Sequence, residues 1–134
     1  MLEQNFIDYY QGAYKPTLRI NFNSRRYLIK FKEIITAIKD GTIETFSFSS
    51  FEGITILGIK DLILRKQSKK LLIPERITMI CNSNSEKPVF IWCLNSEEWW
   101  HCEGLIEGLI ESNEIGHQYL FDEELLIELY LATV

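Results

Sequence analysis

The chain has 134 residues, long enough for one domain and short for two, so we expect a single domain over residues 1–134. Its composition, with 46% hydrophobic and 25% charged residues, is typical of folded globular proteins and excludes disordered and collagen-like chains. The net charge is −5, but residues 1–80 carry 13 basic and 8 acidic residues, whereas residues 81–134 carry one basic and 11 acidic residues. The acidic second half favours a basic protein partner over a nucleic acid.

The sequence shows no targeting or membrane segment. The longest apolar run, residues 89–94, is much shorter than the roughly 20 residues that span a bilayer. The first residues include Glu3 and Asp8 and lack the basic start of a secretory signal. The three cysteines are few and odd in number, which is typical of free thiols in a reducing compartment. We therefore expect a cytoplasmic protein without a membrane partner.

The first forty residues predict a helix, a strand and a second helix. Residues 2–11 space their apolar side chains nearly as a helix does, which predicts a short N-terminal helix. Residues 17–22 alternate apolar and polar side chains and predict a half-buried strand. Over 25–40 the apolar side chains form one stripe at helical spacing. Ser24 can cap the start of this amphipathic helix, and Gly41 lies where a glycine usually ends one.

The middle of the chain predicts strands. From residue 42 to residue 94 the apolar period changes to two, with short runs separated by turn residues. The last run, 89–94, follows a polar turn at 82–87 and is apolar on both faces. This pattern predicts a central strand that is covered on each side.

The C-terminal part predicts a helix and a hairpin. A helix is expected over 96–113, because Asn95 and Glu98 can form a capping box at its start. A loop followed by a strand is expected over 114–121 and a last strand over 125–133, and a short acidic turn joins the two strands. Together the segments predict a single-domain α+β fold, in which a mainly antiparallel sheet of about six to eight strands carries two principal amphipathic helices.

One face of the predicted helix 96–113 is unusual for a solvated helix surface. Glutamates recur at every fourth position along one edge, and like charges at this spacing oppose helix stability. Gly104 and Gly108 each cost about 1 kcal/mol relative to alanine, and Trp100 lies with them, away from the apolar arc. An acidic edge, a projecting tryptophan and bare backbone favour a protein-binding surface. We expect the partner-binding residues to be Trp100, Glu103, Glu107, Glu111, His117, Asp122, Glu123 and Glu124.

The same pattern also allows a purely structural explanation. Another segment, such as residues 2–11, could cover Trp100 and pack closely over the two glycines, since aromatic side chains are usually buried. Trp100 is exposed in the first explanation and part of the core in the second.

A small enzyme is an alternative that rests on few residues. His117 and His101 are the two histidines, and Cys102 is next to His101 in the chain. Adjacent residues point to different sides of a helix, so this pair does not form a nucleophile and base by itself. Histidines and cysteines also lack the spacing of a metal site, so we expect neither a metal nor a cofactor.

A nucleic-acid-binding module is a second alternative. Residues 65–70 contain four cations in six positions, which could contact phosphates. The alternative requires that this stretch join Arg25, Arg26 and Lys30 in one basic patch. The stretch lacks interleaved aromatic residues, and a solvated loop is the expected structure.

The C-terminal third resembles a known family. Residues 103–110 read Glu-Gly-Leu-Ile twice on the predicted helix, and residues 116–120 read Gly-His-Gln-Tyr-Leu before an apolar final strand. This arrangement resembles the ends of small immunity proteins from bacterial polymorphic-toxin systems. The resemblance implies an intracellular α+β protein that binds and neutralises a cognate toxin domain and has no catalytic activity of its own. Toxins that attack nucleic acid are commonly basic, which agrees with the acidic second half.

Overall fold

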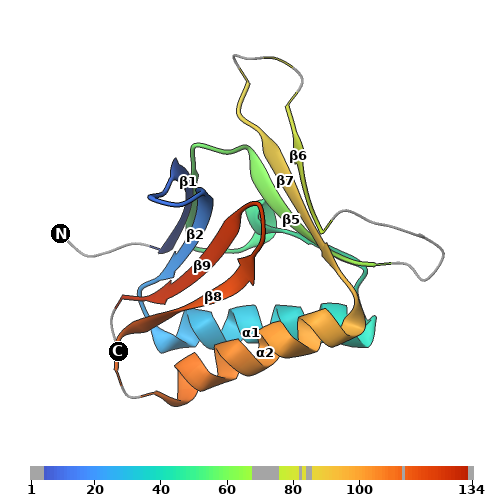
Figure 1. Cartoon of the computed structure of the whole chain (residues 1–134). Coiled ribbons are helices and arrows are strands. Elements are labelled where there is room, and N and C mark those ends of the chain that lie inside the picture. The colour runs from blue at the N-terminus through green and yellow to red at the C-terminus, as the bar shows by residue number, and fades with distance from the viewer. Residues whose placement is uncertain (1–4, 68–75, 82, 84–85, 113, 133–134) are drawn as a thin grey trace.

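The computed structural model describes residues 5–67, 76–81, 83, 86–112 and 114–132. Over these residues the chain forms two α-helices, nine strands and a short 3₁₀ helix at Phe48–Ser50. The predicted single-domain α+β fold is therefore confirmed (Figure 1). The elements in chain order are β1 (Asn5–Gln11), β2 (Pro16–Phe22), α1 (Arg25–Asp40), β3 (Thr45–Ser47), β4 (Ile54–Leu57), β5 (Asp61–Lys66), β6 (Ile77–Ile80), β7 (Val89–Leu94), α2 (Ser96–Glu111), β8 (Gly116–Asp122) and β9 (Leu126–Leu131).

The strands of the described residues form two mixed sheets, where the sequence predicted one mainly antiparallel sheet of six to eight strands. Sheet A has the order β4-β1-β2-β9-β8, and sheet B has the order β3-β5-β7-β6. The pairs β1–β4, β2–β9 and β5–β7 are parallel, and the other four pairs are antiparallel. Each helix carries the chain from one sheet to the other. Strands distant in sequence thus become neighbours, and an alternating pattern does not reveal such neighbours.

The predicted N-terminal helix over 2–11 is wrong for its described part, which is strand β1. This strand pairs with β2 on one side and with β4 on the other. Ile7 is fully buried in the core, and its neighbours Phe6 and Asp8 point to the opposite face. Pairing with two strands decides the conformation here, because the apolar spacing of so short a segment also fits a helix.

The two long helices confirm the sequence prediction, including most of their ends. Gly41 has φ of +80° and ends α1, where its N–H donates to the carbonyl of Ile38 at 3.1 Å. The capping box of α2 is complete: the Glu98 N–H donates to Asn95 Oδ1 at 2.8 Å, and the Asn95 N–H donates to Glu98 Oε1 at 3.0 Å. The Ser24 side chain, by contrast, makes no capping hydrogen bond to α1.

Both helices lie side by side under the two sheets and run in opposite directions (Figure 1). Buried side chains from α1, α2 and both sheets form one continuous core. At its centre the rings of Trp92 on β7 and Trp99 on α2 are 4.8 Å apart, and both side chains are fully buried. β7 lies between β5 and β6, as predicted for a central strand. Among the surfaces that this arrangement leaves in solvent are the outer side of α2 and the face of sheet A opposite the core.

Candidate protein-binding surface

Trp100 lies in solvent on the outer side of α2. Its side chain is 64% exposed, whereas its neighbour Trp99 is fully buried and donates its indole N–H to the carbonyl of Arg65 at 3.2 Å. A Cβ added at Gly104 or Gly108 would meet no atom within 4 Å, so no described element packs over the helix there. The exposure that the binding hypothesis predicted for Trp100 is confirmed. The structural explanation, in which another segment covers this side chain, is wrong for the described residues.

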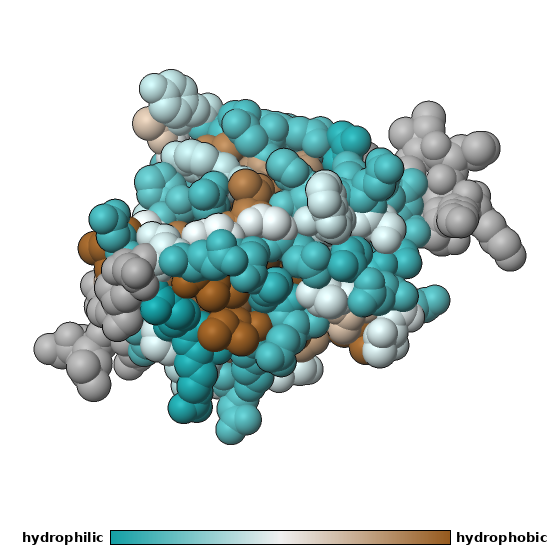
Figure 2. Space-filling model, turned by 90° about the horizontal axis from the view of Figure 1, so that it is seen from below, coloured by the Kyte–Doolittle hydropathy of each residue, from teal (hydrophilic) through white to brown (hydrophobic). Residues whose placement is uncertain are grey.

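The exposed residues of this helix side include Glu97, Trp100, Gly104, Gly108 and Glu111, and we call these five the α2 surface. Figure 2 shows the molecule from the side of the two helices. This side is mainly hydrophilic, and its hydrophobic side chains form small separate groups. Trp100 is therefore a large aromatic side chain surrounded by polar residues. This arrangement is typical of a small protein contact in which one aromatic side chain contributes most of the binding energy.

Two of the predicted acidic contact residues are held by α1. The Lys39 ammonium lies 3.1 and 3.2 Å from the two carboxylate oxygens of Glu103, and the Thr36 hydroxyl donates to the same carboxylate. Partial burial acts to raise the pKa of Glu103, but these hydrogen bonds lower it below its ordinary value. Glu107 forms an ion pair with Lys32, whose hydrogen bond likewise lowers the pKa of Glu107.

The predicted acidic turn is also engaged within the chain. Asp122 lies 2.8 Å from the ammonium of Lys15, and Glu123 lies 2.9 Å from the guanidinium of Arg76. Glu124 lies beside a small apolar pocket of about 210 Å³. The turn joins β8 to β9, so the eight predicted residues are divided between α2, strand β8 and this hairpin turn.

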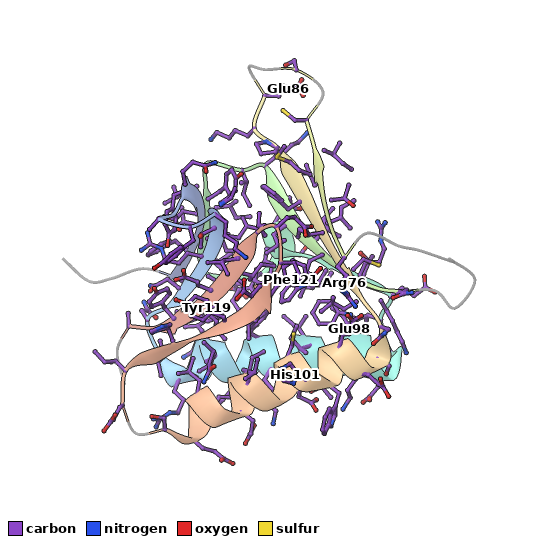
Figure 3. All side chains as sticks on the ribbon, in the orientation of Figure 1. Arg76, Glu86, Glu98, His101, Tyr119 and Phe121 are labelled. Carbon is purple, nitrogen blue, oxygen red and sulfur yellow. The ribbon has the colours of Figure 1, made fainter. Side chains whose placement is uncertain are left out.

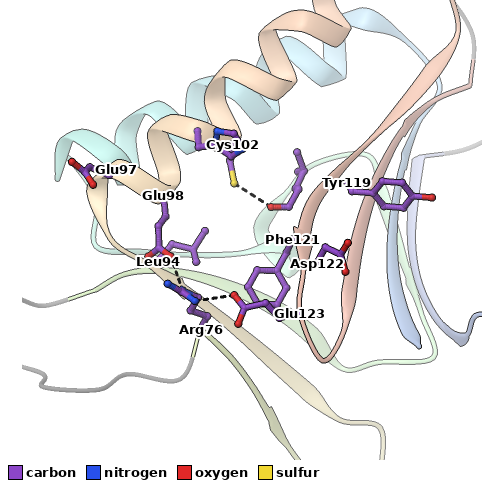
Figure 4. Close-up of a pocket in the computed structure, with 11 residues that line it drawn as sticks. Arg76, Leu94, Glu97, Glu98, Cys102, Tyr119, Phe121, Asp122 and Glu123 are labelled. Carbon is purple, nitrogen blue, oxygen red and sulfur yellow. Dashed lines mark hydrogen bonds and ion pairs between the residues drawn. The ribbon is translucent and has the colours of Figure 1, made fainter. Parts of the chain in front are cut away.

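A pocket of about 480 Å³ lies between α2 and the β8–β9 hairpin. Arg76 lines this pocket and bridges Glu98 of α2 and Glu123 of the hairpin turn (Figure 4). Figure 3 shows Arg76 and Glu98 near each other in the whole molecule. Tyr119 points away from this network, to the other side of the hairpin (Figure 4). The residues that line the pocket are Arg76, Leu94, Glu97, Glu98, His101, Cys102, Tyr119, Leu120, Phe121, Asp122 and Glu123.

The pocket brings His101 and Cys102 together but gives the enzyme alternative little support. The Cys102 thiol is buried and directed at the carbonyl of Leu120, 3.6 Å away. Burial raises the pKa of this thiol to about 12, so it stays protonated near neutral pH. A protonated thiol is a poor nucleophile, and His101 is exposed beside it rather than hydrogen-bonded to it.

The basic residues are divided between the two ends of α1. Lys66 donates to the carbonyl of Lys39 at the C-terminal end, whereas Arg25 and Arg26 begin the helix. Sixteen helical residues place these ends roughly 20 Å apart. The single patch that the nucleic-acid alternative requires is therefore not formed by the described residues. Of the stretch 65–70, the two lysines at 69 and 70 lie outside the described residues.

The outer face of sheet A contains a group that the sequence analysis missed. His117, one of the predicted contact residues, lies on β8 and stacks on Tyr130 of β9 with ring centroids 5.2 Å apart. Beside Tyr130, Glu128 is almost completely buried and accepts a hydrogen bond from the Tyr130 hydroxyl at 2.6 Å. The available signal was a single carboxylate in the otherwise apolar run 125–131.

Two findings limit the chemistry that the described residues offer. They contain no group of three or more histidine, cysteine, aspartate or glutamate side chains placed to hold a metal ion. Neither described helix combines the length and the apolar composition that a bilayer crossing needs.

Comparison with protein families, with characterised proteins and with solved structures finds no match to this chain.

Proposed function

We propose that this protein acts by binding another protein, with the α2 surface as the contact and Trp100 as its anchor. The observation that carries the proposal is the 64% exposure of the Trp100 side chain. Tryptophan contributes strongly to protein interfaces because it removes a large flat apolar area from water. The uncovered backbone at Gly104 and Gly108 lets a partner approach the helix closely beside this side chain.

The partner that we propose is a toxin domain, and the protein is its cytoplasmic, non-catalytic inhibitor. The resemblance of residues 103–120 to immunity proteins supports this choice. The charge distribution also supports it, because residues 81–134 carry 11 acidic side chains and one lysine. Although α1 pairs with Glu103 and Glu107, exposed carboxylates remain at Glu97 and Glu111. The summed negative potential would increase the association rate with a basic partner, most strongly at low salt.

The test is co-purification with the product of the neighbouring gene from the native host, followed by affinity measurement. Trp100→Ala should weaken binding by about 30-fold or more, since truncating such an anchor costs about 2 kcal/mol. Ile29→Ala is the matched control, because Ile29 is an exposed hydrophobic side chain on α1. The control should bind as the unmodified chain does. Equal affinity of Trp100→Ala and the unmodified chain would contradict the proposed contact.

A further inference from the structure

The outer face of sheet A carries a cross-strand row of charged and aromatic side chains. In register, Asp8 on β1 is opposite Arg19 on β2, Arg19 is opposite Glu128 on β9, and Glu128 is opposite Tyr119 on β8. The core residues of these strands alternate with the row and point the other way, toward the helices. Residues that neighbour one another in such a row are close enough for their side chains to interact.

One half of the row already holds a cation. Arg19 donates two hydrogen bonds to Asp8, at 3.0 and 2.7 Å, in a bidentate pair. The same guanidinium lies 5.1 Å from the ring centroid of Phe6 and 5.3 Å from that of Tyr10. Both distances allow cation–π attraction. This half of the face therefore consists of a carboxylate, two aromatic rings and a guanidinium between them.

The other half has a carboxylate and aromatic rings but no cation. Glu128 is only 6% exposed, and Tyr130 donates its hydroxyl to this carboxylate. His117 stacks on Tyr130 and meets the ring of Tyr119 edge-on, with centroids 5.5 Å apart. Within the described ranges, no lysine, arginine or histidine forms an ion pair with Glu128, since Arg19 is directed to Asp8. A buried carboxylate is normally paired with a cation, as the partly buried Asp8 is with Arg19. Glu128 differs from Asp8 in this respect.

The Tyr130 hydroxyl does not replace the missing cation. The hydrogen bond to Glu128, together with burial, raises the pKa of Tyr130 to about 12. At neutral pH the Tyr130 phenol is therefore a neutral hydrogen-bond donor. Glu128 still has no positively charged partner among the described residues. Tyr119, which is 49% exposed, forms an accessible edge of the group.

We propose that Glu128, Tyr130, Tyr119 and His117 form a binding site for the guanidinium of an arginine side chain of a partner protein. The arrangement around Arg19 is the precedent on the same sheet face. A guanidinium suits the site better than an ammonium, because it is planar, stacks on aromatic rings and is less strongly hydrated. The proposal does not rest on the α2 surface, since no residue is shared and the site is on a different element.

The test is an NMR titration of the full chain with N-acetyl-arginine methylamide, following the aromatic signals of His117, Tyr119 and Tyr130. Saturable shifts of these signals, with a dissociation constant on the order of 1–10 mM, are expected for one isolated side chain. The norleucine analogue, which has no charge, should cause no such shifts. The lysine analogue should bind several-fold more weakly. Absence of shifts with the arginine probe, or equal binding of the lysine probe, would overturn the proposal.

Two variants separate the site from general electrostatic attraction. Glu128→Gln should weaken binding of the arginine probe at least tenfold, whereas Glu33→Gln, which removes one exposed charge from α1, should leave it unchanged. If Glu128→Gln disturbs the fold, Tyr119→Ala provides the same test at an exposed position, with an expected loss of about fivefold. Unchanged binding in a folded variant of either residue would contradict the proposal. Trp100→Ala changes no residue of the arginine site. A negative result with the arginine probe would therefore not bear on the proposed partner contact at the α2 surface.

Discussion

The ammonium of Lys39 lies 3.1 Å from the carboxylate of Glu103, although 64 residues separate the two along the chain. The contact joins the C-terminal end of α1 to the middle of α2. Together with the ion pair of Lys32 and Glu107, it makes two glutamates of the acidic edge of α2 part of the interface between the helices. The carboxylates of α2 that stay exposed to a partner outside these two ion pairs include Glu97 and Glu111.

The adjacent tryptophans of α2 should respond differently to truncation. Trp100→Ala should change the free energy of unfolding by less than about 0.5 kcal/mol, because its side chain is in solvent. Trp99→Ala should cost about 3–5 kcal/mol, since it removes a fully buried ring and its hydrogen bond to Arg65. Urea denaturation of both variants provides the measurement. A large loss for Trp100→Ala would mean that this residue belongs to the core.

The glycines of the α2 surface should show opposite effects on stability and binding. Gly104→Ala and Gly108→Ala should each stabilise the free protein by up to about 1 kcal/mol, because the added methyl group meets no atom and alanine favours the helix. The same substitutions should weaken partner binding if the partner approaches the bare backbone. Thermal denaturation and affinity measurement on the same samples test both effects. Stabilised variants that bind normally would place the contact elsewhere.

Glu103 should make the protein sensitive to acid. Its pKa is lowered in the folded state by the hydrogen bonds from Thr36 and Lys39. The corresponding stability is present above the unfolded value of about 4.5 and is lost as the pH falls through the lower folded value. Glu103→Gln should therefore destabilise the protein by about 1 kcal/mol at pH 7 and have little effect near pH 2. Denaturant unfolding at both pH values, with Glu114→Gln as an exposed control, checks this difference.

The buried thiol of Cys102 should make the protein sensitive to alkali. Its pKa rises from 9.0 to about 12 on folding, so the folded state retains a proton that the unfolded chain releases. The free energy of unfolding should therefore fall as the pH rises from about 9 to 12, and Tyr130 adds to this fall above about pH 10. Cys102→Ala should have a smaller pH dependence in this range, as denaturation at about pH 8 and pH 10.5 would show. An identical slope in the variant would contradict the buried thiol.

The sequence by itself determined the elements whose signals are local. The stripe of α1, the capping box at Asn95 and the run of β7 each act within one or two turns or one strand, so pattern and propensity were sufficient. Helical spacing also placed Trp99 and Trp100 on different sides of α2, but only the folded structure decided that Trp100 is left exposed.

Tertiary structure decided everything that depends on a distant partner. Residues 5–11 became a strand because β2 and β4 lie on either side of them. Glu103 became part of a helix interface because Lys39 lies beside it, and Glu128 was left without a cation because Arg19 turns to Asp8. Hydrogen bonds and ion pairs act over a few ångströms, and only the folded chain brings residues so far apart in sequence within that distance.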